Sequence, residues 1–168
     1  SIIVVDPVMV SKSGYRLLAP DACETLIKEL LPIATLLTPN LPEASVIVGY
    51  EVNNKADMLK AAKDIIALGA KSVLMKGGHL QESADDLLYD GNEEVWFTGE
   101  RINTKNTHGT GCTLSSALAA NLALGLSLPD AVRISKDYIS LAISNALDIG
   151  SGCGPTHHFV NLYRKAGL

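Results

Sequence analysis

Short apolar runs alternate with amphipathic segments along the first half of the chain. Apolar runs that stop at a turn residue are typical of strands buried in a parallel sheet, and apolar side chains three or four positions apart are typical of helices. The pattern predicts strands over residues 2–5, 35–37 and 72–76, and helices over residues 20–31, 42–48 and 57–68. Strands and helices that alternate at this spacing predict parallel β–α–β units and therefore an α/β fold.

The second half of the chain has a different pattern. Two short runs at 87–90 and 95–98 surround Gly91-Asn92, which predicts a β-hairpin. Helical periodicity then predicts three helices, over residues 110–124, 129–147 and 156–165. No repeat or linker divides the chain, so we expect residues 1–168 to belong to a single domain. Because the sequence begins inside a strand and without Met, we expect it to be the C-terminal portion of that domain, with the N-terminal part absent.

Composition and charge exclude two kinds of partner. The chain has 168 residues, a net charge of −4 and a pI near 5.5, so it offers no basic stripe for a nucleic-acid backbone. Its longest nearly apolar stretch, residues 117–128, is too short to span a bilayer. Three cysteines without a CxxC pair fit a reducing compartment, and we expect a cytoplasmic protein. The histidines show no metal-ligand spacing, so no zinc site is expected.

The strongest candidate for chemistry is the segment Thr107-His108-Gly109-Thr110-Gly111-Cys112, where a predicted helix begins. Glycines let backbone N–H groups approach an anion closely, and a helix N-terminus directs free N–H groups and a positive dipole end toward it. We expect a positive φ at Gly111, an anion hole at this loop, and Cys112 at its rim, where the dipole favours the thiolate. A phosphate site beside a titratable group suggests phosphoryl transfer. The alternative is an ordinary glycine-rich turn that caps a buried helix.

Other polar residues lie at or just after the ends of predicted strands. Asp6 follows one such strand, Lys76 ends another, and Asn40 lies just after a third, at a helix start. We expect them to share a site with the glycine loop because the carboxyl ends of parallel strands meet at one sheet edge. Lys76 could reach a phosphate, although a strand-end lysine that extends into water is the alternative. Asn40 and Glu43 could equally cap a helix, and Asp6 could be a turn residue. The chain has no Walker A pattern and no dinucleotide fingerprint, which argues against a P-loop NTPase and a Rossmann oxidoreductase.

Five segments together carry a resemblance to one family. They are Asp6-Pro7-Val8-Met9, Thr38-Pro39-Asn40-Leu41-Pro42-Glu43-Ala44, Lys76-Gly77-Gly78-His79, Tyr89-Asp90-Gly91 and Thr107 to Cys112. Their order and spacing resemble the hydroxymethylpyrimidine/phosphomethylpyrimidine kinases of thiamine biosynthesis, in the ribokinase-like superfamily, from Ile3 to about Phe159. Most ribokinase-like enzymes carry Asp at the place of Cys112. A cysteine at this position resembles the sequence of the pyrimidine kinases. The resemblance implies a ribokinase-like three-layer α/β sandwich with a mostly parallel sheet flanked by helices, of which residues 1–168 form the C-terminal portion of a single kinase domain.

The resemblance also implies an activity and a set of site residues. The activity is ATP-dependent phosphorylation of 4-amino-5-hydroxymethyl-2-methylpyrimidine and then of its monophosphate, to give the diphosphate. Cys112 would contact the substrate and accept its hydroxyl proton, and the N–H groups of Gly109, Thr110 and Gly111 would stabilise the transferring phosphoryl group. The other implied contacts are the nucleotide at Asn40, Lys76, Thr107 and Lys136, the pyrimidine at Val8, and Mg²⁺ at Asp6 and Glu43, with Asn40 and Glu43 forming an N-x-x-E pattern.

Two alternative functions stay open. One is a pyridoxal kinase of the same superfamily, whose substrate is also a flat heteroaromatic ring with a hydroxymethyl group. The other is a non-catalytic module that binds a nucleotide or a pyrimidine. The implied partners are small molecules, the pyrimidine alcohol and its phosphate, with no nucleic acid and no membrane. The assembly state stays open, with a homodimer as one option.

Overall fold

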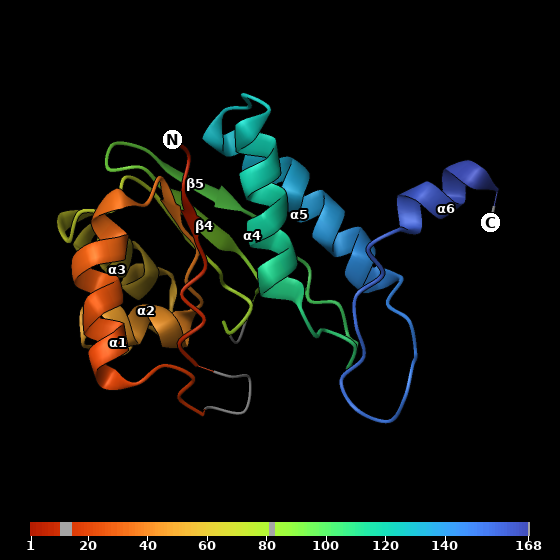
Figure 1. Ribbon diagram of the computed structural model, residues 1–168, viewed down its shortest axis with the longest axis horizontal. Coiled ribbons are helices and arrows are strands. Elements are labelled where there is room, and N and C mark those ends of the chain that lie inside the picture. The colour runs from red at the N-terminus through yellow and green to blue at the C-terminus, as the bar shows by residue number, and fades with distance from the viewer. Residues whose placement is uncertain (11–14, 81–82, 168) are drawn as a thin grey trace. The chain divides into compact units, whose positions relative to one another are not determined.

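The computed structural model describes residues 1–10, 15–80 and 83–167, and the chain divides into two compact units (Figure 1). The first unit spans Ser1–Arg101 and contains the sheet. The second unit spans Ile102–Leu168 and consists of helices and their connecting loops. The expectation that both units belong to one domain stays a prediction.

A five-stranded sheet organises the first unit, in the order β1-β2-β3-β4-β5. Strands β1 (Val4–Val5), β2 (Leu36–Leu37) and β3 (Val73–Met75) are parallel, as the alternation of strands and helices predicts. Strands β4 (Asp86–Tyr89) and β5 (Glu94–Phe97) form the predicted hairpin, and β4 also runs antiparallel to β3. The α/β class is therefore confirmed, with a mixed sheet.

Two helical segments of the first unit lie where the sequence predicts them. The predicted helix at 20–31 is continuous but changes pitch, because α1 (Pro20–Thr25) passes into a wider π turn at Leu26–Leu30 and a tighter 3-10 turn at Leu31–Ile33. Helix α2 (Leu41–Val48) ends at Gly49, whose φ of 78° suits a residue without a Cβ. The predicted end of this helix is confirmed.

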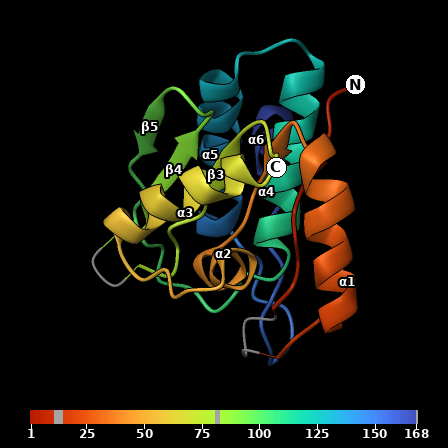
Figure 2. The ribbon, with the colours of Figure 1, turned by 90° about the vertical axis from the view of Figure 1, so that its left-hand side faces the viewer.

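Helix α3 (Lys55–Ala67) lies across β3 and β4 (Figure 2). It begins two residues before its predicted start because the side chain of Asn54 caps it, with Oδ1 accepting the Asp57 N–H at 2.9 Å. One face of the sheet and the three helices enclose the core of this unit. Its buried side chains include Val5, Leu37, Ala44, Ile47, Met58, Ile65, Met75 and Leu87.

In the second unit, α4 (Thr110–Ala123) packs against α5 (Leu128–Ser144), and a shorter α6 (Val160–Ala166) follows. Between the two long helices, Asn121 Nδ2 donates to Ser135 Oγ at 3.0 Å. Within the described part of the chain, no helix is both long and apolar enough to cross a membrane.

The predicted start of the last helix at residue 156 is wrong, since α6 begins at Val160. The residues before it are held in other ways. Pro155 forms a parallel bridge with His108, and the His157 N–H donates to the Ala142 carbonyl at 2.9 Å. These long-range contacts keep the segment out of the helix and tie it to the loop that precedes α4.

Gly77→Ala should destabilise the first unit strongly, whereas Gly78→Ala should not. A Cβ at Gly77 would lie 1.8 Å from the carbonyl oxygen of Asp85, and a Cβ at Gly78 meets nothing within 4 Å. Since the obstacle is backbone, the chain itself has to move, and overpacking of this kind costs about 1–3 kcal/mol or more. Chemical denaturation of the two variants measures the difference. Equal unfolding free energies would contradict the close approach of these two segments.

Candidate functional site

Three strand ends bring polar side chains together at one edge of the sheet in the first unit. Asp6 follows β1, Thr38 follows β2 and Lys76 follows β3. The Lys76 Nζ lies 2.9 Å from Asp6 Oδ1, and their side chains are only 16% and 13% exposed. Thr38 Oγ1 donates to the same Asp6 oxygen at 3.4 Å, and Asn40 forms a parallel bridge with Lys76. The expected meeting of Asp6, Asn40 and Lys76 is confirmed, and we call these residues with Thr38 and Glu43 the strand-end cluster.

Glu43 and Asn40 cap helix α2 reciprocally. Asn40 Oδ1 accepts the Glu43 N–H at 2.9 Å, and Glu43 Oε2 accepts the Asn40 N–H at 2.9 Å. The other carboxylate oxygen, Oε1, accepts the Met9 N–H at 3.3 Å. Burial raises the pKa of the Glu43 carboxyl group above its ordinary value, although the Asn40 N–H and the Lys76 ammonium act to lower it. The capping interpretation of Asn40 and Glu43 is therefore confirmed.

Val8 has an unusual backbone conformation in the loop between Asp6 and Met9. Its φ is 47°, a left-handed value that is rare for a β-branched residue. Its side chain is 43% exposed, so it is available to a ligand. The sequence carried no sign of this strain, because valine is the residue type least expected there. The role of Val8 in a pyrimidine pocket stays a prediction.

Hydrogen bonds and the ion pair at the strand-end cluster favour a Mg²⁺ contact through intervening water. Asp6 already contacts the Lys76 ammonium, and both oxygens of Glu43 accept backbone N–H groups. In the described ranges, no group of three or more His, Cys, Asp or Glu side chains is placed to hold a metal ion. Asp6 Oδ1 accepts from both Lys76 and Thr38, whereas each Glu43 oxygen accepts one N–H and keeps a second lone pair. Mg²⁺ usually retains several of its waters. A Mg²⁺ site at Asp6 and Glu43 stays a prediction, in this water-mediated form.

In the second unit, the loop before α4 is fixed by the chain's last loop. The His108 N–H donates to the Gly154 carbonyl at 3.1 Å, and the Gly154 N–H donates to the buried Asn106 Oδ1 at 2.9 Å. A Cβ at Gly154 would lie 2.6 Å from that Asn106 oxygen, so glycine permits the contact. Hydrogen bonds between Gly154 and both Asn106 and His108 therefore hold the loop that leads into α4.

The N-terminus of α4 matches the predicted anion hole in part. Gly109 is the N-cap and its carbonyl accepts the Thr113 N–H at 2.9 Å, so Thr110, Gly111 and Cys112 form the first turn. The N–H groups of a first turn have no acceptor within their helix and can bind an anion. The Thr110 N–H also donates to the Thr107 carbonyl at 3.4 Å, so an anion there would replace that long contact. The expected positive φ at Gly111 is wrong: Gly111 is helical, and Gly109 has the positive φ, 78°. The helix starts one residue after Gly109, and its cap takes the left-handed conformation.

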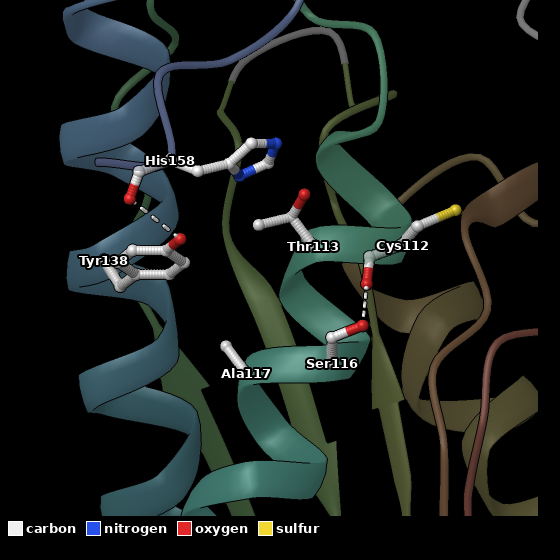
Figure 3. Close-up of a pocket in the computed structure, with 6 residues that line it drawn as sticks. All are labelled: Cys112, Thr113, Ser116, Ala117, Tyr138 and His158. Carbon is white, nitrogen blue, oxygen red and sulfur yellow. Dashed lines mark hydrogen bonds between the residues drawn. The ribbon is translucent and has the colours of Figure 1, made fainter. Parts of the chain in front are cut away.

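A hollow of about 480 Å³ lies beside this helix start (Figure 3). It is lined by Thr113, Ser116 and Ala117 with Cys112 from α4, by Tyr138 from α5, and by His158. Tyr138 donates its hydroxyl hydrogen to the His158 carbonyl at 3.2 Å, which ties the last loop to α5. The Cys112 thiol is exposed and points away from Tyr138 and His158 in Figure 3.

Sequence reasoning missed Tyr138 and His158 as lining residues. The only signal was indirect, since Tyr138 is two residues from Lys136. Residues two apart on a helix do not share a face, so the two side chains leave α5 in different directions. Thr107 lies in the loop, where its carbonyl accepts the Thr110 hydroxyl hydrogen at 2.8 Å. Nucleotide contacts at Thr107 and Lys136 stay predictions, as does the sharing of one site by the strand-end cluster and the α4 loop.

Gly109→Ala should lower stability, whereas Gly111→Ala should keep or raise it. An L residue in the left-handed conformation of Gly109 costs roughly 1–2 kcal/mol, and a Cβ there meets nothing within 4 Å, so the effect is conformational. Alanine in place of a helical glycine gains up to about 1 kcal/mol. Urea unfolding of both variants measures this. The reverse order would mean that the helix begins after Gly111.

The sequence and structure are similar to those of known kinases. A model of the phosphomethylpyrimidine kinase family matches residues 1–157. The hydroxymethylpyrimidine/phosphomethylpyrimidine kinase of Rhizobium meliloti is 52% identical over 160 residues, which cover 93% of this chain and 60% of that protein. The crystal structure of phosphomethylpyrimidine kinase from Clostridium difficile matches with a TM-score of 0.75 and 48% identity, over 84% of this chain and 57% of that one.

A second solved structure is an ADP complex of Bacillus subtilis pyridoxal kinase, with a TM-score of 0.84 and 39% identity over 95% of this chain and 59% of that one. The chain thus spans about 60% of the length of the relatives it matches. The likeness confirms the ribokinase-like α/β fold expected from the sequence. Because the family match covers nearly the whole sequence, the chain belongs to the phosphomethylpyrimidine kinase family.

Proposed function

We propose that the protein carrying this chain transfers the γ-phosphoryl group of ATP to the hydroxymethyl group of 4-amino-5-hydroxymethyl-2-methylpyrimidine, and then to the resulting monophosphate. The observation that carries the proposal is the start of α4, where first-turn N–H groups and an exposed thiol adjoin a hollow of about 480 Å³. Membership of the phosphomethylpyrimidine kinase family supports the substrate, and the ADP complex of the Bacillus subtilis relative supports the nucleotide.

The hollow and the thiol suggest how nucleotide and alcohol are arranged. The Cys112 thiol points away from Tyr138 and His158. The start of α4 therefore has the hollow on one side and the thiol on the other. A nucleotide in the hollow would place its terminal phosphate at the N–H groups of Gly109, Thr110 and Gly111. The alcohol would then approach from the side of the thiol. Such an arrangement would bring the alcohol and the leaving group to opposite sides of the transferring phosphorus, as in-line transfer requires.

The chain's own residues would divide the chemistry between them. Cys112 would accept the hydroxyl proton of the alcohol, and the first-turn N–H groups of α4 would stabilise charge that develops on the transferring group. Lys76 and Lys136 would neutralise part of the phosphate charge, and the uncharged Asn40 and Thr107 would contact the nucleotide. Mg²⁺, held through water near Asp6 and Glu43, supplies further charge neutralisation when bound.

The second candidate function is a pyridoxal kinase, favoured by the fit to the Bacillus subtilis structure. Full-length protein with ATP should be offered the pyrimidine alcohol, pyridoxal or no acceptor, and ADP release measured by a coupled assay. We expect the highest kcat/KM with the pyrimidine alcohol. A higher value with pyridoxal would reverse the assignment, and no acceptor-dependent ADP would identify a non-catalytic binding module.

Cys112→Ala should lower kcat by about 10²–10⁴, because a general base is removed. Nucleotide affinity should change little, since the backbone N–H groups of the first turn remain. Cys153→Ala is the matched control, because Cys153 is also an exposed cysteine of the second unit. Steady-state rates and nucleotide titrations are compared for both variants. An unchanged kcat in Cys112→Ala would remove this thiol from the mechanism.

A further inference from the structure

The loop around Val8 is anchored on both sides of the strained residue. On one side, Asp6 is paired with Lys76 at 2.9 Å. On the other side, the Met9 side chain is buried in the core, and the Met9 carbonyl accepts the Leu17 N–H at 2.8 Å. Val8 lies between these anchors with its own side chain half-exposed.

Something other than Val8 must keep its backbone in the left-handed conformation. A β-branched residue at a φ of 47° is strained, and such strain persists only where the surroundings over-determine the chain. Burial of Val8 cannot supply this restraint, because the side chain is 43% exposed. The restraint therefore has to come from the neighbouring backbone.

Glu43 provides a contact of that kind. Its carboxylate joins two segments far apart in sequence, since Oε1 accepts the Met9 N–H at 3.3 Å and Oε2 accepts the Asn40 N–H at 2.9 Å. The side chain is 3% exposed, so these N–H groups replace the water that the carboxylate has lost. One buried carboxylate thus links the loop after β1 to the start of α2.

We propose that Glu43 is a positioning residue whose two carboxylate oxygens hold the backbone of Met9 and Asn40 and so keep Val8 in its left-handed conformation. Through Val8, Glu43 would set the affinity for the aromatic ring of the substrate, and this last step rests on the proposed function. The assignment is separate from the water-mediated metal role proposed for Glu43, because here the carboxylate acts on the protein backbone. The two roles predict different measurements.

The backbone part of the proposal is tested without activity. In a Glu43→Gln variant the amide side chain has one acceptor oxygen in place of two. A capping box accepts Gln as well as Glu, so that oxygen keeps the shorter contact to the Asn40 N–H and the contact to the Met9 N–H is lost. Hydrogen exchange at the amides of Met9 and Leu17 should become about tenfold faster or more, as expected when a buried hydrogen bond to a charged group is lost. Amides of the β4–β5 hairpin should keep their rates and report on the fold. Glu29→Gln, at an exposed glutamate, is the matched control. Exchange at Leu17 equal to that of the control would overturn the proposal.

The substrate part is tested by kinetics in the full-length protein. At saturating Mg²⁺, Glu43→Gln should raise the KM for the pyrimidine alcohol, whereas Glu29→Gln should not. An unchanged pyrimidine KM at saturating Mg²⁺ would overturn the proposal, and a shifted Mg²⁺ requirement alone would leave Glu43 with the metal role only. If the unmodified protein phosphorylates no acceptor, the proposed function fails, and the hydrogen-exchange result still decides the backbone role.

A pair of variants at Val8 covers the case in which Glu43→Gln does not fold. Asparagine tolerates the left-handed conformation, whereas threonine is β-branched like valine. Val8→Asn should therefore have a higher thermal midpoint than Val8→Thr. An equal or lower midpoint would show that Val8 is not held under strain, and the proposal would fall.

Discussion

The parallel alignment of β1, β2 and β3 is the constraint on which the strand-end cluster depends. Val5 is paired with Leu37, and Leu37 with Val73, so the three strands end at the same edge and the next residues of each chain segment emerge side by side. Side chains alternate between the two faces of a sheet, so a shift of one residue in the strand register would turn the core-facing side chains to the other face. The buried Val5 and Leu37 therefore fix where Asp6 and Thr38 lie.

The groups that could bind an anion are of a different kind in each unit. In the first unit the candidate partner is a charged side chain, the Lys76 ammonium, which is already paired with Asp6. In the second unit the candidates are backbone N–H groups at the start of α4, which carry no titratable charge. Backbone donors are held by the helix itself, so their direction is set before a ligand arrives. This is the kind of preorganisation that stabilises developing charge most effectively.

Most features encoded by local sequence could be predicted, and so could the meeting of the parallel strand ends, whereas individual contacts between other distant residues could not. The roles of Gly49 and the Gly91-Asn92 turn are recognisable in the sequence, and so is the Asn40 to Glu43 spacing. The tie between Tyr138 and His158 and the one between Met9 and Glu43 join residues that are 20 and 34 positions apart. The late start of α6 has the same origin, because its preceding residues pair with the loop before α4.

The pairing of Lys76 with Asp6 has a consequence for which anions this edge can accept. Both side chains are mostly buried and lie 2.9 Å apart, so the ammonium is already neutralised inside the protein. An incoming anion has to compete with a carboxylate that the fold holds next to the cation, and separating a partly buried pair is costly. Weak, singly charged anions gain too little to displace it. In the proposed phosphate role of Lys76, this edge would therefore favour polyvalent ligands over the singly charged ions of simple salts.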